Sequence, residues 1–278
     1  MLIDTHAHLN FREFRDDARD IIDVTLKEDI WMILVGSSYK TSVRAVEYAQ
    51  PYEEGVYAAV GLHPVHLENS VVSENKIEKY EFRIKAEDFQ LDQYRKLAQD
   101  EKVVAIGEIG LDYYHLDPEK NISETKAKQK QAFQAQLDLA CTLDLPVIIH
   151  CREAHLDMLE ILKNFRKTDK SKNFRGVMHC FSGDLDLARK YFDLGLSISF
   201  TGLITFAHNW DKMICEMPLD KLLIETDCPY LTPVPHRGGR NEPRFVKYVA
   251  EKIANLRNIG LDEVAEATTR NARSLFQI

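Results

Sequence analysis

The amino-acid sequence predicts an α/β protein that folds as a single-domain (β/α)8 TIM barrel over residues 1–278. Its length is close to the roughly 250 residues that are typical of this barrel. Eight short apolar runs alternate with charged stretches of helical length, an order that favours parallel strands joined by helices. Near-continuous apolar runs of this kind are typical of strands buried on both faces.

The predicted strands and helices can be followed in order along the chain. The eight apolar runs occupy residues 2–5, 31–37, 56–62, 103–110, 146–151, 176–183, 196–202 and 222–229. Between them, in stretches such as 12–30, 128–143 and 242–257, apolar residues recur every three or four positions, as on one face of a helix. A doubly wound sheet would also alternate strands and helices, but no G-x-G-x-x-G motif follows a strand to support a dinucleotide crevice.

Composition and charge narrow the class of protein. An apolar share of 45% allows a sizeable core, and five cysteines without a C-x-x-C motif argue against a disulfide framework or a thiolate zinc site. The net charge of −8 argues against a generally basic nucleic-acid binder, although a local basic patch or bound cations could still bind one. The sequence shows no secretory signal and no apolar run long enough for a bilayer, so we expect a cytoplasmic protein without membrane contact.

Histidines and acids recur where the predicted strands end. They are His6 and His8 after the first run, His63 after the third, Glu108 in the fourth, His150 in the fifth, His179 in the sixth and Asp227 in the eighth. The carboxyl ends of barrel strands surround one mouth, so these residues should converge in space. We therefore predict a metal site there, although each residue taken singly also has a purely structural explanation.

The structural alternatives differ from residue to residue. A lone His150 or His179 is more often a hydrogen-bonded core histidine than a ligand, and Glu108 could cap a helix. Taken together, four imidazoles and two carboxylates suit one divalent ion or two. Two ions lie about 3.5–4 Å apart when a carboxylate bridges them, and Glu108 is the natural bridge. Glu225 is better placed to orient a histidine than to bind a metal.

Six motifs, in this order along the chain, resemble the TatD family of metal-dependent deoxyribonucleases, which belongs to the amidohydrolase superfamily. They are DTHAHLN, GLHP, GEIGLDYY, VIIHCRE, HCFSG and ETDCPYLTP, and the resemblance extends over essentially the whole chain. It implies the barrel fold, two divalent metal ions as cofactors and DNA as the substrate. Imidazole ligands suit zinc or manganese, whereas the family pattern implies magnesium or manganese, so Mg, Mn and Zn all stay open.

The resemblance also implies roles for individual residues. His6, His8 and Asp227 would hold one ion, and His150 and His179 would hold the other, with Glu108 between the two. Asp227 would act as general base for a metal-activated water, with Glu108 as the second catalytic residue. His63, Arg152 and Arg237 would bind the substrate phosphates. Two segments, 67–90 and 115–129, are longer than the family pattern. Both follow predicted strands and so overhang the mouth, the first as an ordered lid or a floppy insertion.

The function expected from these observations is exonucleolytic hydrolysis of phosphodiester bonds at single-stranded DNA ends by a monomer. The main alternative is hydrolysis of another bond with the same metals, as in an amidase, a lactonase or a D-aminoacyl-tRNA deacylase. A non-catalytic nucleic-acid-binding barrel and a purely structural barrel are further alternatives. The complete set of six candidate ligands argues against the binding barrel, and the structural barrel predicts that His6→Ala and Asp227→Ala change little beyond stability.

Overall fold

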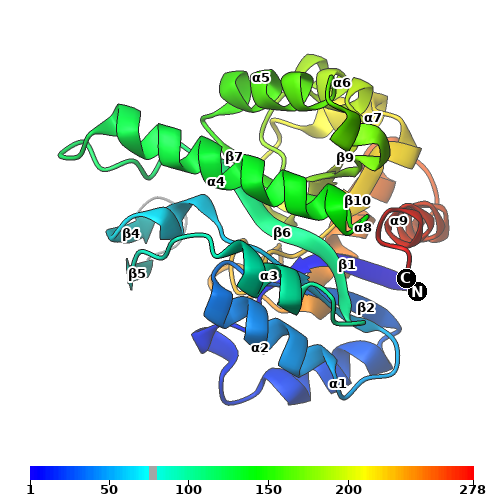
Figure 1. The fold of residues 1–278 in the computed structure, drawn as a ribbon. Helices are drawn as coiled ribbons and strands as arrows, with labels where there is room; N and C mark the ends of the chain where they lie inside the picture. The colour runs from blue at the N-terminus through cyan, green and yellow to red at the C-terminus, as the bar shows by residue number, and fades with distance from the viewer. Residues whose placement is uncertain (75–79) are drawn as a thin grey trace.

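The computed structural model describes residues 1–74 and 80–278, and its centre is a barrel of eight parallel strands (Figure 1). In barrel order the strands are β1 (Leu2–Ala7), β2 (Ile30–Val35), β3 (Val56–Val60), β6 (Val103–Asp112), β7 (Val147–Arg152), β8 (Gly176–Met178), β9 (Leu196–Phe200) and β10 (Leu222–Ile224). Each of the eight predicted apolar runs overlaps one of these strands, and the predicted TIM barrel is confirmed.

Helices connect the strands and cover the outside of the barrel (Figure 1). They are α1 (Ala18–Lys27), α2 (Tyr39–Ala49), α3 (Leu91–Leu97), α4 (Ile122–Thr142), α5 (His155–Phe165), α6 (Leu185–Asp193), α7 (Asp211–Glu216), α8 (Val246–Arg257) and α9 (Leu261–Phe276). Short 3-10 helices are η1 (Arg12–Phe14), η2 (Pro64–Leu67), η3 (Asp169–Asn173), η4 (Gly202–Thr205), η5 (Leu219–Lys221) and η6 (Pro243–Phe245). None of the described helices combines the length and the apolar character that a membrane span requires.

The strands are apolar on both faces because each face packs against a different core. One cluster fills the space between the strands and the surrounding helices. A second, smaller cluster includes Ile3, Ile33 and Ile148 from three strands together with Phe276 of α9. All ten residues of β6 are buried, as expected for a strand that is covered on both faces.

The barrel is nearly closed by a short seam between β1 and the segment that follows β10. The backbone N–H of Asp227 donates to the carbonyl of His6 over 2.8 Å, and the N–H of His8 donates to the carbonyl of Cys228 over 2.9 Å. Ala7 and Cys228 form an isolated parallel bridge between these two bonds. The seam therefore brings the first and last predicted ligands of the chain together.

Part of the long segment 67–90 forms a two-stranded antiparallel hairpin of β4 (Ser70–Glu74) and β5 (Tyr80–Ile84). The predicted lid or insertion thus includes an ordered pair of strands, while residues 75–79 lie outside the described part of the chain. Figure 1 shows the hairpin projecting on the same side as the start of α4, away from the two termini. At its base, Glu68 pairs with Lys128 at 2.8 Å and Lys120 at 3.4 Å, which joins the two extended segments.

Candidate metal centre

All six predicted ligands lie together at the mouth of the barrel. His6 and Asp227 meet across the seam, Glu108 and His150 come from β6 and β7, and His8 and His179 directly follow β1 and β8. This convergence follows from the parallel strands, whose carboxyl ends all point to the same mouth.

The carboxylate of Glu108 separates the four histidines into two pairs. Its Oε1 atom lies 2.9 Å from Nε2 of His179 and 3.1 Å from Nδ1 of His150. Its Oε2 atom lies 3.6 Å from Nε2 of His6 and 3.9 Å from Nε2 of His8. Each oxygen therefore faces a different pair of imidazoles, and the side chain is 7% exposed.

Asp227 completes the half of the cluster that contains His6 and His8. Its Oδ1 atom lies 3.4 Å from Nε2 of His8 and 3.7 Å from Nε2 of His6. The residue has a left-handed backbone with φ of 57°, so the chain turns sharply where β10 ends. The Asp227 side chain is 16% exposed and is the more open of the two carboxylates.

A buried acid that sequence analysis did not single out holds this turn in place. Asp4 is fully buried in β1, and its Oδ1 atom accepts hydrogen bonds from the backbone N–H groups of Thr226 at 2.9 Å and His6 at 3.2 Å. Burial raises the pKa of Asp4 well above its ordinary value. Asp4 thus ties the residue before Asp227 to the strand that carries His6.

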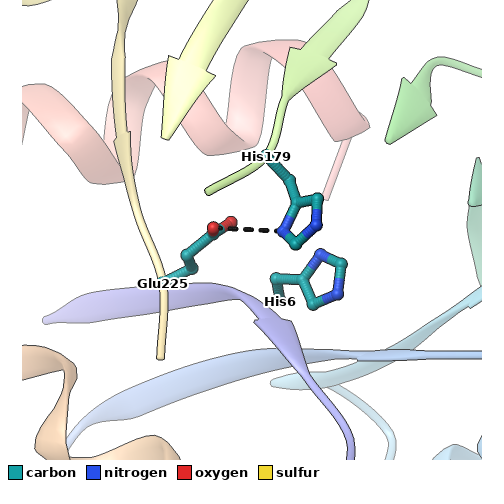
Figure 2. Close-up of side chains that lie close together, drawn as sticks. All are labelled: His6, His179 and Glu225. Atoms are coloured by element: carbon teal, nitrogen blue, oxygen red, sulfur yellow. Dashed lines mark ion pairs between the residues drawn. The ribbon is translucent and has the colours of Figure 1, made fainter. Parts of the chain in front are cut away.

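Glu225, which we expected to orient a histidine, contacts the opposite ring nitrogen of His179. Figure 2 shows its carboxylate directed at Nδ1 of His179, and the two atoms are 3.3 Å apart. Glu225 also accepts hydrogen bonds from the N–H of Cys180 and the hydroxyl of Ser199, both at 2.7 Å. The ring of His6 stacks on His179 with centroids 4.0 Å apart. Glu225 therefore supports His179 from behind the cluster.

The donor atoms present fit divalent metal ions. The ligand atoms of His6, His8 and Glu108 lie within 4.8 Å of one another, and so do those of Glu108, His150 and His179. The Nε2 atoms of His6 and His8 are only 3.1 Å apart and face the same space as two carboxylates. Imidazole nitrogens and carboxylate oxygens are common ligands of zinc and manganese.

For Glu108 and His179, nearby charges outweigh burial in setting the pKa. Burial raises the pKa of Glu108, but the nearby His63 and His179 outweigh it, and the pKa is well below its ordinary value. Burial lowers the pKa of His179, but Glu108 and Glu225 outweigh it, and the pKa is well above 6.5. The Glu108 carboxylate is therefore ionised at neutral pH.

The three residues predicted to bind phosphate follow or end strands on the side of the mouth, and their contacts differ. His63 is buried, with Nε2 3.3 Å from Oε1 of Glu108. The guanidinium of Arg152, at the end of β7, lies 3.8 Å from the centre of the Tyr114 ring. The guanidinium of Arg237 lies 3.9 Å from the centre of the Phe206 ring, in a loop that follows β10. His63 thus contacts the cluster directly, whereas each arginine packs against an aromatic ring.

Hydrogen bonding fixes which nitrogen of His63 carries a proton. Its Nδ1 atom accepts a hydrogen bond from the backbone N–H of Val65 at 3.2 Å, so in the neutral ring the proton is on Nε2. That Nε2–H group faces Glu108. His63 is therefore arranged as a hydrogen-bond donor at the cluster rather than as a metal ligand.

Besides Asp4, three further buried residues around the cluster were not predicted from the sequence, Asp112 and two glutamines of α4. Asp112 ends β6 and contacts His150. Gln129 and Gln136 each make two hydrogen bonds to the backbone of one residue, Asp112 and Leu62 respectively. The sequence offers a signal for Asp112, which lies in the GEIGLDYY motif, and none for the two glutamines.

Comparisons with known proteins show which family this chain resembles. A family model described as TatD related DNase matches residues 3–277. The uncharacterized metal-dependent hydrolase YabD of Bacillus subtilis is 40% identical over 281 residues, which cover 100% of both chains. The uncharacterized metal-dependent hydrolase YcfH of Escherichia coli K12 is 35% identical over 282 residues, which cover 100% of this chain and 96% of YcfH. The crystal structure of YjjV, a TatD homolog from Escherichia coli K12, matches with a TM-score of 0.81 at 31% identity, covering 100% of this chain and 98% of YjjV.

Proposed function

Because this chain belongs to the family of TatD-related DNases, which are metal-dependent hydrolases, we propose that it is a deoxyribonuclease that cleaves phosphodiester bonds with two divalent metal ions. Its substrate is a DNA end, most readily a single strand, because a barrel mouth admits a splayed strand more easily than a duplex. Mg, Mn and Zn are the candidate ions.

The observation that carries the proposal is the position of Glu108 between two pairs of histidines. Its two carboxylate oxygens face two separate pairs of histidines, His6 with His8 and His150 with His179. A carboxylate placed between two sets of ligands is suited to a pair of ions, which in phosphodiester hydrolysis clamp the attacking and leaving oxygens.

His6, His8 and Asp227 would hold one ion, His150 and His179 the other, and Glu108 both. Divalent ions in such a site polarise the phosphoryl group and lower the pKa of water from about 15.7 to about 7. The imidazoles and carboxylates of the cluster can bind cations only when their ligand atoms carry no proton.

Asp227 is the residue proposed to accept the proton of the attacking water. Burial raises its pKa, but the hydrogen bond with His8 and the charges of His6 and His179 outweigh burial, so the pKa is below its ordinary value. The side chain is therefore ionised at neutral pH, and it is the more exposed of the two cluster carboxylates. An ionised carboxylate at the open side of the site is suited to the role of general base.

Three side chains are proposed to bind the phosphates of the substrate. His63 presents its Nε2–H group to the cluster, and two guanidinium groups are added by Arg152 at the end of β7 and Arg237 in the loop that follows β10. Guanidinium groups can contact two phosphate oxygens at once. These local charges allow DNA to bind although the chain carries a net charge of −8.

The test is hydrolysis of end-labelled single-stranded DNA by the metal-stripped protein with and without added Mg²⁺, Mn²⁺ or Zn²⁺. The variants are Glu108→Gln and Asp227→Asn, and Glu119→Gln is the control because this exposed carboxylate lies in a loop at the mouth but outside the cluster. We expect a metal-dependent ladder that shortens from one end, lost in both cluster variants and kept in the control.

Intact DNA in every metal would contradict the proposed substrate. If the protein nevertheless binds two ions, carboxylic esters, lactones, amides and D-aminoacyl-tRNA become the next substrates to assay. A duplex of the same sequence, run in parallel, measures the preference for single strands. Cleavage of the duplex as fast as of the single strand would contradict that preference.

A further inference from the structure

Asp112 is a buried carboxylate at the edge of the metal centre that the proposed reaction does not use. It is the last residue of β6 and is 1% exposed. Its Oδ2 atom lies 3.2 Å from Nε2 of His150 and 2.7 Å from Nδ1 of His115. Its Oδ1 atom accepts a hydrogen bond from the backbone N–H of His115 at 3.0 Å. Both carboxylate oxygens thus have partners, and two imidazoles share one of them.

The backbone of Asp112 is fixed from the outside of the barrel by α4. The N–H of Asp112 donates to Oε1 of Gln129 at 2.9 Å, and Nε2 of Gln129 donates to the carbonyl of Asp112, also at 2.9 Å. Gln129 itself is 3% exposed. This pair of hydrogen bonds leaves the main chain at Asp112 little freedom to rotate.

The two nitrogens of His150 face different carboxylates. Nδ1 faces the cluster, 3.1 Å from Glu108 and 3.4 Å from Nε2 of His179. Nε2 faces away from it, toward Asp112. An ionised carboxylate can only accept hydrogen bonds, so the contact with Asp112 requires a proton on Nε2. In the neutral ring this leaves the lone pair of Nδ1 directed into the cluster.

We propose that Asp112, held by Gln129, is a positioning residue for the metal centre. It accepts a hydrogen bond from Nε2–H of His150 and thereby keeps Nδ1 as the atom of His150 that binds metal. A carboxylate behind a metal-binding histidine sets its tautomer, its ring orientation and its basicity. The inference rests on the metal centre of the proposed function and does not depend on DNA being the substrate.

A competing interpretation makes Asp112 a ligand of a further ion. Ligand atoms of His63, Asp112 and His150 also lie within 4.8 Å of one another. The hydrogen bond from Val65 to Nδ1 of His63, however, places the proton of the neutral His63 ring on Nε2, the nitrogen that would have to bind. His115 already occupies both oxygens of Asp112. The contacts therefore favour the positioning role.

The experiment measures Zn²⁺ affinity and stoichiometry of the whole chain by competition with a chromophoric chelator. The variants are Asp112→Ala, Asp112→Asn and Gln129→Leu. The matched controls are Glu119→Gln, in the loop that follows β6, and Gln134→Leu, on the exposed face of α4. We expect the same number of ions in every variant, an affinity about 10–100-fold weaker in Asp112→Ala, a smaller loss in the other two, and no change in the controls.

A second measurement separates positioning from general stability. Proton–nitrogen NMR of the Zn²⁺-loaded protein should show a slowly exchanging Nε2–H of His150, which Asp112→Asn should shift or expose to exchange. Unchanged affinity together with an unchanged His150 signal, even if the melting temperature falls, would overturn the proposal. The loss of one whole ion would also overturn it, in favour of Asp112 as a ligand. Weakened Zn²⁺ binding in a protein that cleaves no DNA would support it and would contradict only the DNA substrate.

Discussion

The Nε2 atom of His6 lies 3.1 Å from the Nε2 atom of His8, directly beside the seam that closes the barrel. Residues two apart in a strand point to the same side, which brings the two rings together. The carboxylate of Glu108 on β6 and that of Asp227 in the turn after β10 face this pair. The pair therefore forms one half of a divided cluster, and the pair of His150 and His179 forms the other.

Removal of one imidazole should empty one half of the cluster and leave the other. We expect His8→Ala to lower the bound metal from two ions to one per chain, because His150, His179 and Glu108 keep their contacts. Elemental analysis after metal loading measures this ratio. His208→Ala is the control, since His208 is 71% exposed and pairs with Asp211. Two ions retained in His8→Ala would contradict the assignment of His8.

Metal affinity should rise with pH, because three imidazoles of the cluster hold their protons strongly. Burial lowers the pKa of His8, His150 and His179, but neighbouring carboxylates outweigh it, and all three values are raised above 6.5. Binding must displace these protons. Each displaced proton should increase the affinity up to about tenfold per pH unit between 6.5 and the raised pKa. Calorimetry in buffers with different ionisation enthalpies counts the protons released.

The same shifts predict opposite trends for the metal-free and the loaded protein. A raised histidine pKa stabilises the fold fully below the ordinary value of 6.5, and this contribution is lost as the pH rises through the folded-state pKa. Above pH 6.5 the metal-free protein should therefore lose stability from these three groups while metal binding strengthens. The gap between the two melting temperatures should widen with pH. A constant gap from pH 6.5 to 8.5 would contradict the protonation of these groups.

The strands and the convergence of the six candidate ligands could be predicted because both depend on short-range patterns. Apolar runs marked the strands, and a parallel barrel brings strand ends to one mouth, so position along the run was enough to assemble the cluster. The buried position of Asp112 was not predicted, because the apolar run ends at residue 110 whereas β6 continues through Asp112. Two additional residues of strand turn an apparent loop acid into a buried partner of His150.

The glutamines of α4 could not be predicted, because their role depends on packing between distant segments. The helix begins at Ile122 rather than near residue 128. Its first turns are therefore formed by part of the segment 115–129, which we expected to be an extended connection. In the sequence, Gln129 and Gln136 have the same polarity as the exposed Gln134. Only the position of α4 against the ends of β3 and β6 distinguishes them.

Gln136 should contribute substantially to stability through its two backbone hydrogen bonds. The N–H of Leu62 donates to Oε1 of Gln136 at 2.8 Å, and Nε2 of Gln136 donates to the carbonyl of Leu62 at 3.1 Å. Gln136→Leu would leave both buried groups without partners, at a cost of about 1–3 kcal/mol each. Chemical denaturation should thus show a loss of about 2–6 kcal/mol. Gln134→Leu should change stability by less than about 0.5 kcal/mol. An equal loss in both variants would contradict a stabilising role of the two hydrogen bonds between Gln136 and Leu62.

The arginine at the rim of the mouth should show its role in the salt dependence of DNA binding. Arg237 donates a hydrogen bond to the carbonyl of Thr232 at 2.9 Å and packs against Phe206, so its guanidinium is held in a loop that follows β10. Each phosphate that a cation neutralises on a single strand contributes a slope of about −0.7 to the logarithm of affinity against the logarithm of salt concentration. We expect Arg237→Ala to weaken binding of a single-stranded oligonucleotide and to make this slope shallower by about 0.7.

The matched control is Arg189→Ala, because Arg189 is an exposed arginine of α6 that pairs with Asp186 within its own helix. Fluorescence anisotropy at several salt concentrations, in Ca²⁺ or with Asp227→Asn as the background to prevent cleavage, gives both affinity and slope. Equal slopes for Arg237→Ala and Arg189→Ala would show that Arg237 contacts no phosphate. A shallower slope in Arg237→Ala alone would mean that a phosphate lies at the Phe206 side of the mouth, and this would fix the path of the strand relative to Asp227.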